Sequence, residues 1–147
     1  IDCGLMFPDS DMAGVDLVLP DFTYLTENAH RVEGVVAPHG HEDHIGALPY
    51  LLMRTRVPVY GSPLTIALVA EKLREHGLED VELRPIRPRD RIEVGQFVVE
   101  PLRVTHSIAD GVGLAITTPT LESIGNEPGN RREQQHRHRA NAEHRPQ

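Results

Sequence analysis

The most constraining feature of this sequence is a run of six residues that holds three histidines and two carboxylates, side chains that commonly bind metals. The run reads His39-Gly40-His41-Glu42-Asp43-His44. Zinc accepts imidazole nitrogen and carboxylate oxygen as ligands at roughly 2.0–2.2 Å. Two histidines one residue apart in a loop can converge on one ion, and Asp43 and His44 lie far enough along to address a second. A lone H-x-H pair is usually a solvated loop, but this density of ligand types predicts a metal site.

The segments on either side of the run predict alternating strands and helices. Residues 32–37 form a short run that is rich in β-branched side chains, which is typical of a buried strand. Residues 57–60 form a second run of this kind. Residues 45–53 have helical spacing, although Pro49 is tolerable only near the first turn of such a helix. The metal-ligating run therefore lies at a strand-to-helix junction.

A second helix and a group of strands follow. Ser62 is a plausible N-cap, Pro63 suits the first helical position, and Gly77 is a stop signal. The predicted helix, residues 64–75, has an apolar stripe of Leu64, Ala67, Leu68, Ala70 and Leu73. Residues 81–105 and 112–117 alternate like strands. This order of elements predicts a layered α/β domain.

Composition excludes several classes of protein. A net charge of −7 and a pI of about 5.7 give no overall basic signal for nucleic acid. The single cysteine, Cys3, rules out an internal disulfide framework, fits a reducing compartment such as the cytoplasm, and is interpreted as a small buried hydrophobe. We expect no membrane segment, because no apolar run approaches the roughly 18 residues that a span requires.

The last part of the chain differs from the rest in composition. Residues 119–147 are rich in Arg, Gln, Asn, Glu and His and show no periodic apolar pattern. Such a segment buries too little surface to offset its ordering entropy, so we expect an unstructured tail that proteases remove first. The predicted domain therefore comprises residues 1–118. A frameshift or an erroneous gene end is our hypothesis for the origin of the tail.

Four stretches of the chain resemble a known family. The pattern H-x-H-x-D-H after a strand is similar to the metallo-β-lactamase superfamily, which includes lactamases, thioesterases, lactonases and nucleases. The wider sequence resembles ribonuclease J, a family of β-CASP RNA hydrolases, over about residues 1–118, as an N-terminal fragment. The stretches are Asp2-Cys3-Gly4-Leu5-Met6-Phe7-Pro8, residues 14–22, Ile45-Gly46-Ala47-Leu48-Pro49-Tyr50-Leu51-Leu52, and Val104-Thr105-His106-Ser107-Ile108-Ala109-Asp110.

The resemblance implies a partial αββα metallo-β-lactamase fold with two zinc ions in the intact family. The ligands that it implies are His39, His41 and His106 for one zinc, and Asp43 and His44 for the other. Asp43 would also be catalytic. Asp2 matches an aspartate that orients the ligand loop, and ligating imidazoles commonly donate their other N–H to such a carboxylate. Taken alone, His106 would be a strand-end histidine and Asp2 a turn residue, so both roles rest on the resemblance. His30 matches no ligand position.

The function that the resemblance implies is hydrolysis of RNA phosphodiester bonds by a zinc-activated hydroxide. In the family this serves RNA maturation and decay in the cytoplasm, by 5′-to-3′ exonuclease and endonuclease activity, in a homo-oligomer. One alternative is a metallo-β-lactamase-fold hydrolase of small molecules, a thioesterase or lactonase. The other is a fragment that binds metal without catalysis.

The sequence also departs from the family. Pro38 stands where the family has threonine, and Ala109 where it has proline. In the sequence given, no aspartate follows Asp110, although the family has one there that bridges both metals, and no stretch of it resembles the family's β-CASP domain. We therefore expect this chain to bind at most one zinc and not to cleave RNA above background.

Overall fold

Three short parallel strands form the sheet from which the metal-ligating run emerges. In the computed structural model, which describes residues 1–119, β1 (Val35–Ala37), β2 (Val59–Gly61) and β3 (Leu83–Pro85) pair in that order. All residues of β1 and β2 are buried. The strands predicted over residues 32–37 and 57–60 are confirmed with changed bounds, because pairing covers only the last three residues of the first run and extends one residue past the second.

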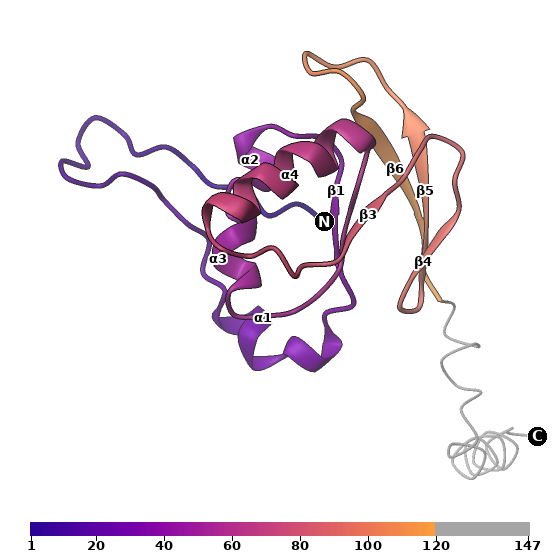
Figure 1. Cartoon of the computed structure of the whole chain (residues 1–147), viewed down its shortest axis with the longest axis horizontal. Helices are drawn as coiled ribbons and strands as arrows, with labels where there is room; N and C mark the ends of the chain where they lie inside the picture. The colour runs from indigo at the N-terminus through magenta and orange to yellow at the C-terminus, as the bar shows by residue number, and fades with distance from the viewer. Residues whose placement is uncertain (120–147) are drawn as a thin grey trace, which may run out of the picture. The chain divides into compact units, whose positions relative to one another are not determined.

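A second sheet packs against the first. It consists of β4 (Ile92–Val94), β5 (Phe97–Arg103) and β6 (Val112–Thr117), and β4 pairs with β5 antiparallel. Buried residues from both sheets form a shared core, which contains Val36, Tyr60, Ile86, Val94 and Val99. Figure 1 shows β1 and β3 between the helices and the second sheet. The predicted α/β class is confirmed as layers of helix, sheet and sheet.

The longest helix, α4 (Pro63–Glu75), begins as its sequence predicts. The Ser62 side chain accepts a hydrogen bond from the backbone N–H of Thr65, and Gly77, at φ 69°, follows the helix end. The predicted apolar stripe coincides with the core face at Leu73 but not at Leu64 or Leu68. The side chains that α4 buries are Thr65, Val69 and Leu73. Leu64 and Leu68 are instead partly exposed, because they lie on the side of α4 that faces the histidine-bearing loops.

The single helix predicted over residues 45–53 is also wrong, because the structure has two short helices, α2 (Glu42–Ile45) and α3 (Leu48–Leu52). The N-terminal segment causes the break: the Ala47 N–H donates to the carbonyl of Cys3 at 2.9 Å instead of to a helical carbonyl. Pro49 lies in the first turn of α3, as expected. The helices and the first sheet share a core, to which α3 contributes Leu48, Leu51 and Leu52.

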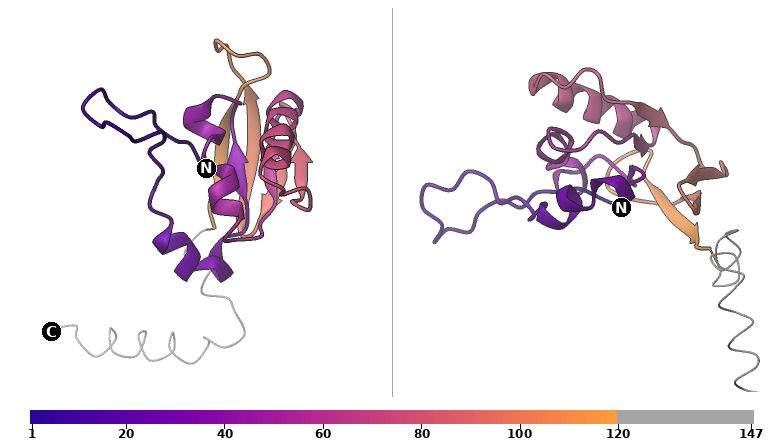
Figure 2. Two further views of the ribbon diagram at one scale, coloured as in Figure 1. Left: turned by 60° about the vertical axis from the view of Figure 1, so that its left-hand side comes forward. Right: turned by 90° about the horizontal axis from the view of Figure 1, so that it is seen from below.

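The chain before α2 is irregular apart from two short helices, α1 (Thr23–Glu27) and η1 (Ala29–Arg31). One antiparallel bridge between Met6 and Val18 closes a loop that projects away from the helices in both views of Figure 2. Residues Ile1–Ile116 form one compact unit. The predicted unstructured tail lies outside the described residues, apart from Pro119. Within residues 1–119, no helix is long and apolar enough to span a membrane.

Candidate metal centre

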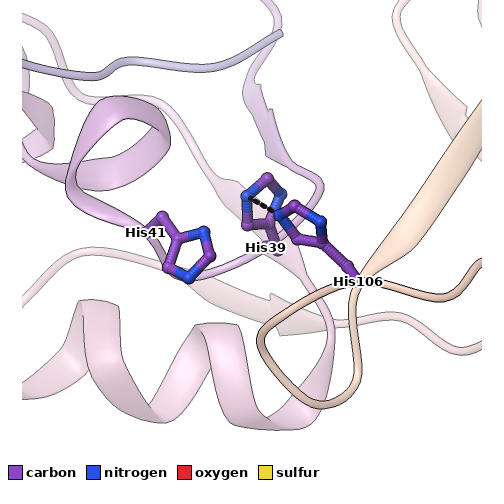
Figure 3. Close-up of side chains that lie close together, drawn as sticks. All are labelled: His39, His41 and His106. Atoms are coloured by element: carbon purple, nitrogen blue, oxygen red, sulfur yellow. Dashed lines mark hydrogen bonds between the residues drawn. The ribbon is translucent and has the colours of Figure 1, made fainter.

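Three histidines from two distant segments meet at one edge of the first sheet. His39 lies two residues after the end of β1, and His41 is the N-cap residue of α2, with extended backbone at φ −76° and ψ 154°. His106 comes from the loop between β5 and β6. The loops are held together by a backbone hydrogen bond of 3.0 Å from the Val112 N–H to the Pro38 carbonyl. Figure 3 shows the three rings turned toward one another.

The ring nitrogens of the three histidines are close enough to share one ion. One ligand atom from each of His39, His41 and His106 lies within 4.8 Å of the others. The Nε2 atoms of His39 and His106 are 3.0 Å apart. Among the described residues, the side chains that come together closely enough to hold one metal ion with three or more ligand atoms are those of His39, His41 and His106. Their role as ligands remains a prediction.

His39 lies at the centre of the cluster and is only 9% exposed. Burial lowers its pKa, and the neighbouring imidazoles of His44, His106 and His41 lower it further. A neutral imidazole is the form that binds a metal, because its unprotonated nitrogen carries the lone pair. The surroundings of His39 therefore favour the state that a ligand requires.

His44, Asp43 and Asp2 form a second group beside the first. The Nδ1 atom of His44 is 2.7 Å from Oδ1 of Asp2, and its Nε2 atom is 3.4 Å from Oδ2 of Asp43. Because a carboxylate accepts hydrogen bonds, the Asp2 contact places the proton on Nδ1 and leaves Nε2 available. The ring of His44 also lies beside that of His39, with centroids 3.9 Å apart. The Asp2 carboxylate thus contacts the ligand loop at His44, and its role in orienting that loop stays a prediction.

The N-terminal segment fixes Asp2 by crossing α2 at close range. The N–H groups of Cys3 and Leu5 donate to the carbonyls of His44 and Glu42, at 2.8 and 3.1 Å. A Cβ atom on Gly4 would lie 1.8 Å from the carbonyl oxygen of Asp43, so only glycine permits this approach. Cys3 is buried, as interpreted from the sequence, and burial raises the pKa of its thiol to about 11.

Two contacts that join α4 to the histidine-bearing loops were not predicted from the sequence. Lys72 of α4 forms a salt bridge with Glu42, with Nζ 2.9 Å from Oε1, and so ties α4 to the ligand loop. Asp110, two residues beyond Ile108 in the His106 loop, accepts a hydrogen bond from the Leu64 N–H at 3.3 Å. Both contacts join residues far apart in the sequence, so no local pattern indicates them.

Comparison with known proteins places the chain in a family. A family model described as a beta-lactamase superfamily domain matches residues 2–123. The chain belongs to this superfamily. Ribonuclease J of Synechocystis sp. is 51% identical over 122 residues, which cover 81% of this chain and 19% of that protein. Ribonuclease J of Thermus thermophilus is 46% identical over 127 residues, covering 81% and 22%. The predicted resemblance to ribonuclease J is confirmed, and the chain spans about a fifth of the length of these relatives.

The fold agrees with this placement. The Rm3 metallo-beta-lactamase superposes with a TM-score of 0.51 at 20% identity, over 63% of this chain and 38% of that one. The metallo-beta-lactamase fold protein YhfI from Bacillus subtilis gives 0.50 at 19% identity, over 80% and 56%. The predicted partial metallo-β-lactamase fold is therefore confirmed, and a fold of this family implies metal binding.

Proposed function

We propose that this chain supplies the metal-binding part of a zinc-dependent RNA hydrolase. The observation that carries the proposal is the convergence of His39, His41 and His106 in a chain that is 51% identical to a ribonuclease J over 122 residues. In this proposal the reaction is hydrolysis of RNA phosphodiester bonds, exonucleolytic from the 5′ end and endonucleolytic, in RNA maturation and decay. A cytoplasmic location and a homo-oligomeric assembly stay predictions.

The histidine cluster fits a zinc ion on geometric grounds. Two imidazole nitrogens bound to one tetrahedral zinc at about 2.05 Å lie about 3.4 Å apart. The separation of 3.0 Å between the Nε2 atoms of His39 and His106 is close to this value, and one ligand atom of each of the three residues lies within 4.8 Å of the others. The His106 side chain is exposed, so its ring has room to turn toward a bound ion. Three protein ligands also match the number typical of catalytic zinc sites, which leave one position open.

Each residue has a definite task in the proposal. A zinc ion held by His39, His41 and His106 would supply Lewis acidity and lower the pKa of bound water to about 7. Asp2 fixes the tautomer and orientation of His44 through their 2.7 Å contact. We assign His44 and Asp43 to a second zinc. The Asp43 side chain is 71% exposed, so it is accessible to substrate, and we assign it the catalytic carboxylate role.

The described residues offer the second ion fewer ligands than the first. Three imidazoles surround one point, but Asp43 and His44 alone remain for another ion within residues 1–119. Because catalytic zinc sites ordinarily take three ligands from protein, we expect the isolated chain to hold one zinc per molecule and not to cleave RNA.

Metal analysis of the purified chain tests the ligand assignment. After dialysis against zinc and then against zinc-free buffer, we expect about one zinc per wild-type chain. His41→Ala should lose it, because two histidines remain. His30→Ala is the matched control, since His30 lies exposed in η1, and it should retain the metal. Equal zinc contents in the His41→Ala and His30→Ala variants would contradict the assignment of His39, His41 and His106 as zinc ligands.

A chimera tests the reaction. The matched segment of the Synechocystis ribonuclease J is replaced by residues 1–118 of this chain, and the product is assayed on 5′-monophosphorylated RNA and on a panel of thioesters and lactones. We expect RNA cleavage that His41→Ala abolishes and His30→Ala preserves. A folded chimera that hydrolyses a thioester or lactone but not RNA would replace the proposal with the small-molecule alternative.

A further inference from the structure

A pocket lined by two arginines lies on the same sheet edge as the histidine cluster. Parallel strands end at a common edge, so the segment after β3 emerges on the side where His39 follows β1. Residues 86–91 form that segment, and in Figure 1 they run beside the end of β5 from which the His106 loop departs. Arg103, the last residue of β5, precedes His106 by three residues, a span of roughly 10 Å in extended chain.

The pocket has a volume of about 530 Å³ and is lined by Pro88, Arg89, Pro101, Leu102 and Arg103. The Arg89 N–H donates to the carbonyl of Pro101 at 3.0 Å, which fixes the loop to β5. Two proline rings stiffen the walls, because proline fixes its own φ. The site therefore combines a rigid hollow with two guanidinium groups.

Arg89 and Arg103 differ in their electrostatic partners from Arg91, which lies in the same loop as Arg89. Within residues 1–119, neither Arg89 nor Arg103 has a carboxylate within 4.0 Å of its guanidinium group, whereas Arg91 lies 3.7 Å from Glu100. The side chain of Asp90, which lies between Arg89 and Arg91 in sequence, accepts a hydrogen bond of 2.7 Å from the Arg87 N–H. In a chain with a net charge of −7, these two arginines place two positive charges beside one pocket, with no salt bridge to either among the described residues.

The backbone of Arg89 gives independent support. Its φ of 78° lies in the left-handed region, which is unfavourable for every residue except glycine, and the residue is nevertheless arginine. Residues held in such conformations gather at ligand clamps and active sites. A glycine would be more stable at this position, so the arginine side chain is held here at a cost in backbone free energy.

We propose that Arg89 and Arg103 bind a phosphodiester of a single RNA strand whose scissile phosphate lies at the histidine cluster. The proposal rests on the proposed function and adds a second point of contact to it. Guanidinium groups bind phosphate with paired, charge-assisted hydrogen bonds, and contacts of this kind position a strand without reading its bases.

The test is equilibrium binding of the full chain to a fluorescein-labelled 12-nucleotide oligouridylate, followed by anisotropy over a series of salt concentrations. EDTA is present throughout, so neither zinc binding nor cleavage affects the measurement. We expect Arg89→Gln and Arg103→Gln each to reduce the slope of log affinity against log salt by about 0.7, the value for one contact to a single strand. Arg91→Gln, in the same loop but paired with Glu100, is the matched control and should leave the slope unchanged.

Arg89→Gly separates a binding role from a structural one. Glycine suits the backbone at this position, so the variant should melt at a higher temperature than wild type while it binds the oligonucleotide as weakly as Arg89→Gln. An unchanged salt slope in both Gln variants, an equal loss in Arg91→Gln, or no binding by the wild type at low salt would each overturn the proposal. Failure of the chimera to cleave RNA would instead reject the proposed function, because that assay reports on chemistry and this one on binding alone.

Discussion

Replacement of Gly4 by alanine should detach the N-terminal segment from the ligand loop. The new Cβ atom would lie 1.8 Å from the carbonyl oxygen of Asp43, 2.1 Å from its carbonyl carbon and 2.8 Å from its Cα atom. All three are backbone atoms, so no side-chain rotation relieves the overlap. The segment that carries Asp2 has to move away from α2, or α2 has to move with it.

The expected loss follows from what this movement breaks. Three backbone hydrogen bonds join the segment to the ligand loop, from Cys3, Leu5 and Ala47, and each contributes about 1 kcal/mol. The buried Leu5 side chain contributes about 2 kcal/mol more. Partial relaxation recovers some of this sum, so we expect Gly4→Ala to lower the free energy of unfolding by about 3–5 kcal/mol. That is a large fraction of the about 5–15 kcal/mol that stabilises a typical domain.

Urea unfolding followed by circular dichroism measures the effect, and Gly111→Ala provides the control. A Cβ atom on Gly111 would meet its nearest neighbour, Cβ of His39, at 3.5 Å, which is an ordinary contact. Gly111→Ala should therefore change the unfolding free energy by less than about 1 kcal/mol in either direction. The reasoning fails if Gly4→Ala unfolds within about 0.5 kcal/mol of wild type, because the close approach to Asp43 would then not exist in solution.

Two further substitutions test the packing that supports the site, both by urea unfolding. Leu52→Ala removes a fully buried side chain of α3 and should lower the unfolding free energy by about 2–5 kcal/mol, whereas Leu102→Ala, at 50% exposure, should change it by less than about 1 kcal/mol. Ser62→Ala removes the cap of α4 and should lower the free energy of unfolding by about 1 kcal/mol, with faster hydrogen exchange at the Thr65 amide. Unaltered exchange at this amide would show that Ser62 does not cap the helix.

Local signals in the sequence were sufficient for some elements and not for others. The start of α4 was predicted because Ser62 and Pro63 act on the backbone next to them, and such effects need no tertiary context. The break between α2 and α3 was not predicted, because it depends on a residue 44 positions away, Cys3, whose carbonyl takes the Ala47 N–H. Gly46 has helical φ and ψ, so its presence alone did not indicate the break.

The buried face of α4 was predicted wrongly for a related reason. Apolar periodicity marks a side that avoids water, but it does not say what covers that side. Leu68 lies where a Cβ atom on Gly40 would be, with its Cδ1 atom 2.4 Å from that position, so it flanks the ligand loop and not the main core. Thr65 is buried instead, since its hydroxyl is satisfied by the Ser62 side chain at 2.8 Å.

The candidate site shows the same division between local and distant information. His39 and His41 are visible as a pair in the sequence, but His106 is 67 residues from His39, and only family resemblance indicated it. They meet because the loops that follow β1 and β5 both begin at the same edge of the sheet. Helix α4 contacts each loop once, through the salt bridge of Lys72 with Glu42 and the hydrogen bond from the Leu64 N–H to Asp110. The pocket of Arg89 and Arg103 uses the ends of β3 and β5 at this same edge. A substitution that shifts β5 along the sheet should therefore disturb the histidine cluster and the arginine pocket together, whereas one that loosens α4 should affect the histidines and leave the arginines in place.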